Sequence, residues 1–159
     1  HYPVELEEGD RSGAYVRVTP QGGPAWVGFF ALGFDSDQVV NQVCSMPDPE
    51  RFCVVVGGYA YVVKASDPAE WLRVDQRPVV DMRVLSQQCL LLFVGFTSIT
   101  AVCSSGIAWT TERLTWEGLT ITEVIGETLL GRGWDALADK EVPFTVDLKT
   151  GKHIGGARP

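Results

Sequence analysis

The fold is decided by the stretch PVVDMRVLSQQCLLLFVGFTSITAVCSSGIAWTTER, residues 78–113. Four runs of strand character follow one another in it, over residues 78–85, 89–96, 97–103 and 107–113. The run over 89–96 is continuously apolar, as in a strand covered on both faces, whereas its neighbours alternate, as in half-exposed strands. Small polar residues at 86–88 and 104–106 indicate turns. The stretch therefore predicts four consecutive strands.

The same pattern recurs along the chain. A glycine followed by an aromatic residue returns at spacings of 37 and 38 residues, in Gly58-Tyr59, Gly95-Phe96 and Gly133-Trp134. A second marker, an aromatic residue that opens an alternating run, returns at Trp26, Trp71, Trp109 and Phe144. Because two independent markers agree on the period, each repeat is expected to form one four-stranded antiparallel unit.

Units of this length and strand number resemble the blades of a β-propeller. The resemblance lies in the repeat pattern alone and implies one all-β domain over residues 1–159 that closes as a small ring. Its expected units cover about 1–38 (partial), 39–77, 78–116 and 117–157. The strands missing from the first unit are expected from residues 2–7 and 152–154, so that both chain ends meet in one blade. The alternative is a β-sandwich or barrel of repeated hairpins.

Composition and charge narrow the classes of partner. The chain has 20 acidic and 13 basic residues and a net charge of −7. Its hydrophobic fraction of 45% excludes intrinsic disorder. A nucleic acid is not expected, because its binding rests on Lys and Arg that neutralise phosphates. The longest uncharged stretch, residues 84–111, is interrupted by polar residues, so no membrane segment is expected. A protein partner, in particular a basic one, fits this charge, and a homodimer is compatible with the repeats.

Cysteine usage and the chain start bear on localisation. Cys44, Cys53, Cys89 and Cys103 lie in apolar surroundings without a CxxC pair, which favours reduced thiols in a cytoplasmic protein and no zinc site. If they were oxidised, three pairings would remain open. The chain begins with His1-Tyr2-Pro3 instead of Met, so a trimmed or vector-derived N-terminus is expected. No metal or other cofactor is expected.

No catalytic residues are predicted. His153 is the only internal histidine, it lies among glycines, and no Gly-x-Ser-x-Gly nucleophile motif occurs. Asp35, Asp37 and Asp135 could supply paired carboxylates for glycoside hydrolysis. They occur in turn-like segments, however, where aspartate commonly hydrogen bonds to the local backbone.

The aromatic residues give the strongest signal for binding. Most of them recur at equivalent positions, which core packing alone explains, whereas Trp116 falls outside the repeated markers. The candidate binding residues are Trp116, Trp134, Asp135, Asp35 and Asp37. The expected function is a non-catalytic protein-interaction module, whose most specific form is an immunity-type inhibitor of a basic toxin. The alternative is a carbohydrate-binding or glycoside-hydrolysing protein that uses aromatic platforms and loop carboxylates.

Overall fold

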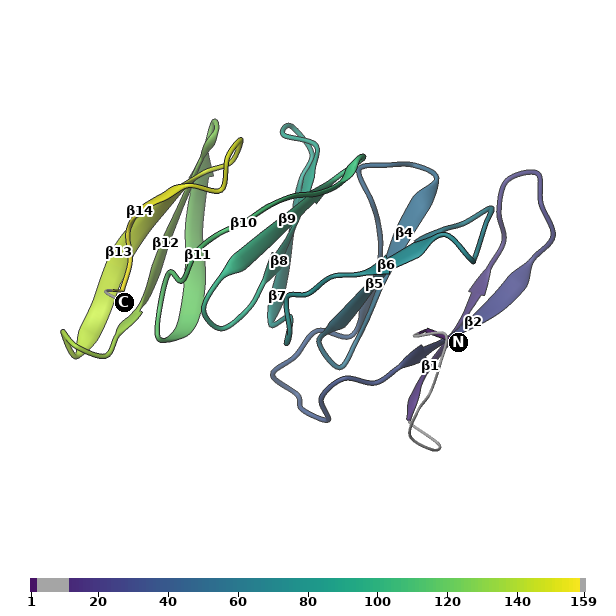
Figure 1. The fold of residues 1–159 in the computed structure, drawn as a ribbon, viewed down its shortest axis with the longest axis horizontal. Coiled ribbons are helices and arrows are strands. Elements are labelled where there is room, and N and C mark those ends of the chain that lie inside the picture. The colour runs from purple at the N-terminus through teal and green to yellow at the C-terminus, as the bar shows by residue number, and fades with distance from the viewer. Residues whose placement is uncertain (3–11, 158–159) are drawn as a thin grey trace. The chain divides into compact units, whose positions relative to one another are not determined.

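A computed structural model describes residues 1–2 and 12–157 of the chain. The described residues form strands and loops without a helix (Figure 1). The strands are β1 (Gly13–Val18), β2 (Trp26–Ala31), β3 (Gln42–Ser45), β4 (Arg51–Val56), β5 (Tyr59–Lys64), β6 (Trp71–Arg73), β7 (Asp81–Leu85), β8 (Leu90–Val94), β9 (Ile99–Cys103), β10 (Gly106–Thr110), β11 (Glu117–Ile125), β12 (Thr128–Asp135), β13 (Lys140–Asp147) and β14 (His153–Gly155).

The strands form four antiparallel sheets. The first sheet contains β1 and β2, and the other three are four-stranded meanders, β3–β6, β7–β10 and β11–β14, in which neighbours in the chain are neighbours in the sheet. The all-β class and the repeated four-stranded sheets are thus confirmed. The strands of the third sheet follow the four runs predicted from residues 78–113 to within a few residues.

Burial explains why the strands differ in pattern. Every residue of β8 is buried, which confirms that its continuously apolar run is covered on both faces. In β12, buried and more exposed residues alternate, because only one face of the fourth sheet is covered. Gly131 of β12 lies opposite Phe144 of β13, and a Cβ at Gly131 would come within 2.3 Å of the Phe144 ring. The glycine therefore lets this ring lie over the strand.

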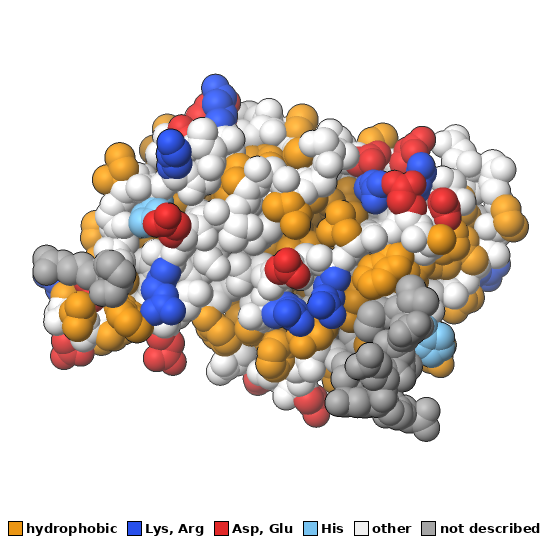
Figure 2. All heavy atoms as spheres, in the orientation of Figure 1, with side chains coloured by type: hydrophobic (Ala, Val, Ile, Leu, Met, Phe, Trp, Pro, Cys, Tyr) orange, Lys and Arg blue, Asp and Glu red, His pale blue; other side chains and the backbone are white. Residues whose placement is uncertain are grey.

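The chain divides into two compact units, residues 1–79 and 80–159. The core of the first unit surrounds Phe30, Val54 and Tyr61, and Tyr2 stacks on Phe30 with ring centroids 4.6 Å apart. The core of the second unit joins the third and fourth sheets through Leu92, Trp109 and Phe144 among others. Figure 2 shows acidic and basic side chains interspersed on the visible face of the molecule.

Two tryptophans hold neighbouring sheets together in the same way. The Trp26 Nε1–H donates to the Ala65 carbonyl at 2.8 Å, and the Trp109 Nε1–H donates to the Leu148 carbonyl at 2.7 Å. Each tryptophan lies in the last strand of its sheet, and each acceptor directly follows the third strand of the next sheet. The two strands of the first sheet therefore correspond to the third and fourth strands of a complete sheet.

One repeat marker was assigned wrongly. Trp71 and Trp109 lie in the fourth strands of their sheets, whereas Phe144 lies in β13, the third strand of the fourth sheet. The strands β11, β12 and β13 are longer than the corresponding strands of the second and third sheets. For this reason, the residue one repeat length after Trp109 lies in the third strand of the fourth sheet and not in the fourth strand.

Ring closure through the C-terminal segment is also wrong. Strand β14 pairs with β13 and completes the fourth sheet, and the described strand pairings close no ring. The turn before β14 is the cause, because Gly151 adopts a φ of +70° and its N–H donates to the Asp147 carbonyl, which returns the chain alongside β13. At the other end Tyr2 forms a parallel bridge with Phe30, and the rest of the predicted 2–7 strand lies outside the described residues.

The part of the chain that the structure describes contains no helix of the length and apolar character needed to cross a lipid bilayer.

Candidate functional site

The uncovered face of the fourth sheet carries a row of three side chains. Trp134 of β12 lies directly opposite Glu117 of β11 and Glu141 of β13, and residues paired in this way project from the same face of a sheet. Trp134 is 37% exposed, and both glutamates are exposed. The row therefore places an indole ring between two carboxylates at the protein surface.

The row lines an open cavity of about 470 Å³. Arg132 shares this face, because it lies two residues before Trp134 on the same strand, and it is also exposed. Within residues 12–157, neither Glu117 nor Glu141 forms an ion pair, and Arg132 has none either. Two carboxylates and one guanidinium thus remain available to a ligand, with an excess of negative charge.

A buried threonine positions the row. Thr115 is fully buried, and its Oγ1 lies 2.8 Å from the Trp134 carbonyl oxygen and 3.0 Å from that of Gly118. Gly133 makes room for it, since a Cβ there would come within 2.4 Å of the Thr115 Cβ. The bulge at Gly118, whose φ is +67°, sets Glu117 opposite Trp134, and a second register shift follows between Ile121 and Glu123.

The second predicted tryptophan lies beside the first. Trp116 immediately precedes β11, is 38% exposed, and donates its backbone N–H to the Trp134 carbonyl at 2.9 Å. The Arg113 guanidinium lies over the Trp116 ring, with its carbon 4.6 Å from the ring centroid. This pair shows that an exposed indole of this sheet accepts a cation on its face.

The three predicted aspartates lie elsewhere. Asp135 is only 2% exposed and faces away from the row, and its carboxylate accepts the backbone N–H groups of Leu137 and Ala138 at 2.9 and 3.3 Å. This carboxylate is therefore used to stabilise the turn between β12 and β13. Asp35 and Asp37 lie exposed in the loop that follows β2 in the first unit. The structure thus joins the backbones of Trp116 and Trp134, but Trp116 is not among the residues that line the cavity, and the aspartates lie outside it as well.

Sequence reasoning missed the two glutamates. The signal for Glu141 was the four-residue turn over residues 136–139, because it pairs Asp135 with Lys140 and therefore Trp134 with Glu141. That turn ends in Asp139 with a φ of +50°, a conformation that aspartate adopts more readily than most residues. Glu117 could not be found in this way, because its register depends on the bulge at Gly118.

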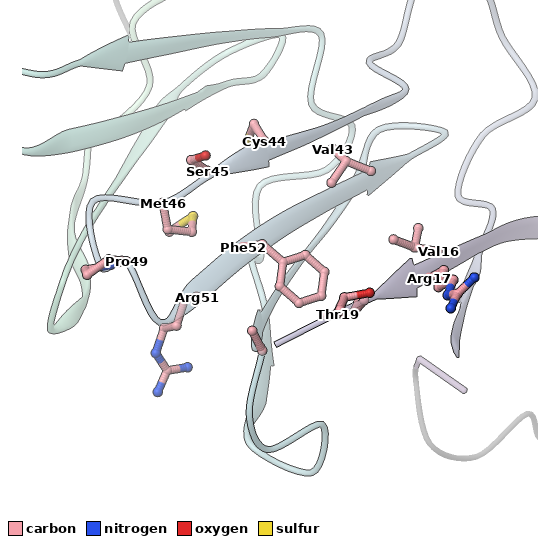
Figure 3. A pocket seen from close by; sticks show the side chains of 12 residues that line it. Val16, Arg17, Thr19, Val43, Cys44, Ser45, Met46, Pro49, Arg51 and Phe52 are labelled. Atoms are coloured by element: carbon pink, nitrogen blue, oxygen red, sulfur yellow. The ribbon is translucent and has the colours of Figure 1, made fainter. Parts of the chain in front are cut away.

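A larger groove lies in the first unit, with a volume of about 630 Å³ (Figure 3). Its apolar lining includes Val16, Val43, Met46 and Phe52. Arg51, at its edge, forms ion pairs with Asp48 and Glu70 and is thereby neutralised. This groove could not be predicted from the sequence, because it lies between strands of different sheets.

His153 and a metal-binding cluster are the remaining candidates. Nδ1 of His153 lies 3.0 Å from the Gly155 carbonyl oxygen, which ties the ring to its own strand. The described ranges hold no group of three or more histidine, cysteine, aspartate or glutamate residues arranged to bind a metal ion.

No protein-family model matches the chain, and no curated protein shows significant similarity to it.

Proposed function

We propose that this chain is a non-catalytic protein-binding module, built on blade-like sheets, that binds a basic segment of its partner on the uncovered face of the fourth sheet. The observation that carries the proposal is the row of Glu117, Trp134 and Glu141. A Lys or Arg side chain of the partner lies over the indole ring, between the two carboxylates.

The chemistry of the row favours a cation. A cation on the face of a tryptophan contributes about 0.5–2 kcal/mol, and each exposed ion pair adds about 0.2–1 kcal/mol. The Arg113–Trp116 pair is an example of the same interaction within the chain. The net charge of −7 also attracts a basic partner over distance and speeds association at low salt.

Arg132 shapes the specificity of the site. Its guanidinium lies on the same face as Trp134 and lacks an ion-pair partner within the described ranges. It repels a second cation placed next to the first, and it accepts a carboxylate of the partner. The preferred segment therefore carries separated basic residues, with an acidic residue nearby. A basic toxin held by an immunity-type inhibitor is the most specific form of this proposal.

An arginine peptide and its citrulline counterpart test the proposal. Citrulline keeps the shape of arginine and removes its charge, so we expect only the arginine peptide to bind, as measured by fluorescence anisotropy at low ionic strength. Trp134→Ala should weaken binding about 30-fold, as expected for an aromatic hot spot of about 2 kcal/mol. Glu117→Gln combined with Glu141→Gln should weaken it about fivefold, from two exposed ion pairs of about 0.5 kcal/mol each.

Two controls accompany these variants. Tyr15→Ala removes a side chain that is 76% exposed in the first unit, and it should leave binding unchanged. Arg132→Gln should strengthen binding of the arginine peptide, because it removes a like charge from the cavity. Equal binding of both peptides would contradict the proposal. Binding of a glycan on an array, lost in Trp134→Ala, would instead favour the carbohydrate alternative, in which the indole stacks on a sugar.

A further inference from the structure

Two cysteines face each other across the edge of the second sheet. Cys44 of β3 lies directly opposite Cys53 of β4, and both are free thiols. We propose that Cys44 and Cys53 form a dithiol site that reacts with small organic disulfides and is converted into a cross-strand disulfide. This site is independent of the binding surface on the fourth sheet.

The register makes the bond geometrically accessible. Directly opposed residues of antiparallel strands have Cα atoms about 4.5–5.5 Å apart, within the range of about 4.4–6.8 Å found in disulfides. Their side chains project from the same face of the sheet. The two side chains also interact, and this interaction shifts the pKa of both thiols.

The two cysteines differ in access. Cys44 lies on the edge strand of its sheet and is partly exposed. Cys53 lies on an inner strand and has no exposed surface. A small disulfide in solution therefore reaches Cys44 before Cys53.

The two cysteines also differ in acidity. The hydrogen bond from Cys53 holds the pKa of the Cys44 thiol below its usual value, and this effect outweighs partial burial, which acts to raise it. The same hydrogen bond, together with burial, holds the pKa of Cys53 well above its usual value. Cys44 is therefore the attacking thiolate, because the thiolate is the nucleophile in exchange, and Cys53 is the thiol that resolves the intermediate.

The reaction balances in two exchange steps. The Cys44 thiolate attacks one sulfur of the disulfide RSSR, which forms a mixed disulfide on Cys44 and releases RS⁻. The released RS⁻ takes the proton of the Cys53 thiol and leaves as RSH. The Cys53 sulfur then attacks the Cys44 sulfur of the mixed disulfide and displaces the second RS group as RS⁻. This thiolate takes a proton from water and becomes the second RSH. Two protein thiols are oxidised, and one RSSR is reduced to two RSH. The new bond ties the short edge strand β3 to β4.

The experiment uses a background variant that isolates the pair. Cys89 is exposed and Cys103 is partly exposed, so Cys89→Ser and Cys103→Ser are introduced together to remove competing thiols. This variant is incubated with bis(2-hydroxyethyl) disulfide and followed by mass spectrometry. We expect it to lose two hydrogen atoms, to retain no adduct, and to yield a peptide linked through Cys44 and Cys53 after non-reducing digestion.

Single replacements in the same background test the order of the steps. Adding Cys53→Ala should trap the mixed disulfide on Cys44, whereas adding Cys44→Ser should leave Cys53 unmodified. A stable adduct on Cys44 with Cys53 present, or an adduct on Cys53 with Cys44 replaced, would overturn the proposal. If Cys53→Ala does not fold, the background variant is quenched with acid at early times. An adduct on Cys44 must then precede the linked peptide, and its absence would refute the mechanism.

Discussion

Replacing Trp109 with alanine is expected to lower the free energy of unfolding of the second unit by about 3–5 kcal/mol, the usual cost of truncating a buried tryptophan. The side chain is 7% exposed and packs in the core that joins the third and fourth sheets. The substitution opens a cavity there and removes the hydrogen bond from Nε1 to the Leu148 carbonyl. Urea denaturation followed by circular dichroism measures the effect, since the signal does not depend on one tryptophan.

Two further variants separate packing from hydrogen bonding at this position. Trp109→Phe keeps most of the buried ring but leaves the Leu148 carbonyl without its donor, so a loss of about 1–3 kcal/mol is expected. Trp116→Ala removes a tryptophan that is 38% exposed, and a loss below about 1 kcal/mol is expected. If Trp109→Ala and Trp116→Ala destabilise the protein equally, Trp109 does not hold the two sheets together.

The second large effect is expected at the turn between β4 and β5. Gly57 and Gly58 have φ values of +58° and +72°, as a two-residue turn of type I′ requires. A Cβ at Gly57 would lie 2.6 Å from the Phe34 carbonyl oxygen and 2.8 Å from the Gly33 nitrogen, and both are backbone atoms that cannot move aside alone. Gly57→Ala should therefore destabilise the first unit by about 2–5 kcal/mol, from a backbone strain of about 1–2 kcal/mol and the clash.

Gly126 provides a matched control for this variant. It has a φ of +56° in the turn between β11 and β12, but a Cβ there would meet no atom within 4 Å. Gly126→Ala should cost only the strain of about 1–2 kcal/mol. Thermal denaturation of both variants measures the difference. Equal losses would show that the Phe34 segment does not pack against the turn as described.

The sequence was sufficient to predict the sheets, because their strands follow one another in the chain. Each turn is short, and the alternation of apolar residues sets which face is covered, as in β12. The expectation that the run over 97–103 forms a half-exposed strand was wrong, because Ile99, Thr100, Ala101 and Val102 of β9 are all buried. The spacing of the aromatic residues predicts the length of the repeat, but it does not show in which strand of a sheet each aromatic residue lies. For this reason, Phe144 was assigned to the wrong strand.

The parts that could not be predicted depend on register and on contacts between sheets. Glu117 reaches Trp134 only through a bulge, and the groove beside Phe52 is formed by residues of different sheets. Predicting that Cys44 lies opposite Cys53 would need the exact register of β3 against β4. The sequence of a four-residue edge strand does not define that register. The buried Asp135 carboxylate follows the general tendency of aspartate to hydrogen bond to the local backbone in turns.

The meander order has a consequence for how the chain acquires its structure. Every ladder between the described strands β1–β14 joins strands that are consecutive in the sequence, so each hairpin closes a short loop and loses little chain entropy. Sandwiches and barrels that pair distant strands fold slowly because long loops must close first. Here one hairpin can form before the rest of the chain is ordered, and neighbouring sheets can then add to it, as in other repeat proteins. On a ribosome, each sheet can therefore begin to form as soon as its own residues have emerged.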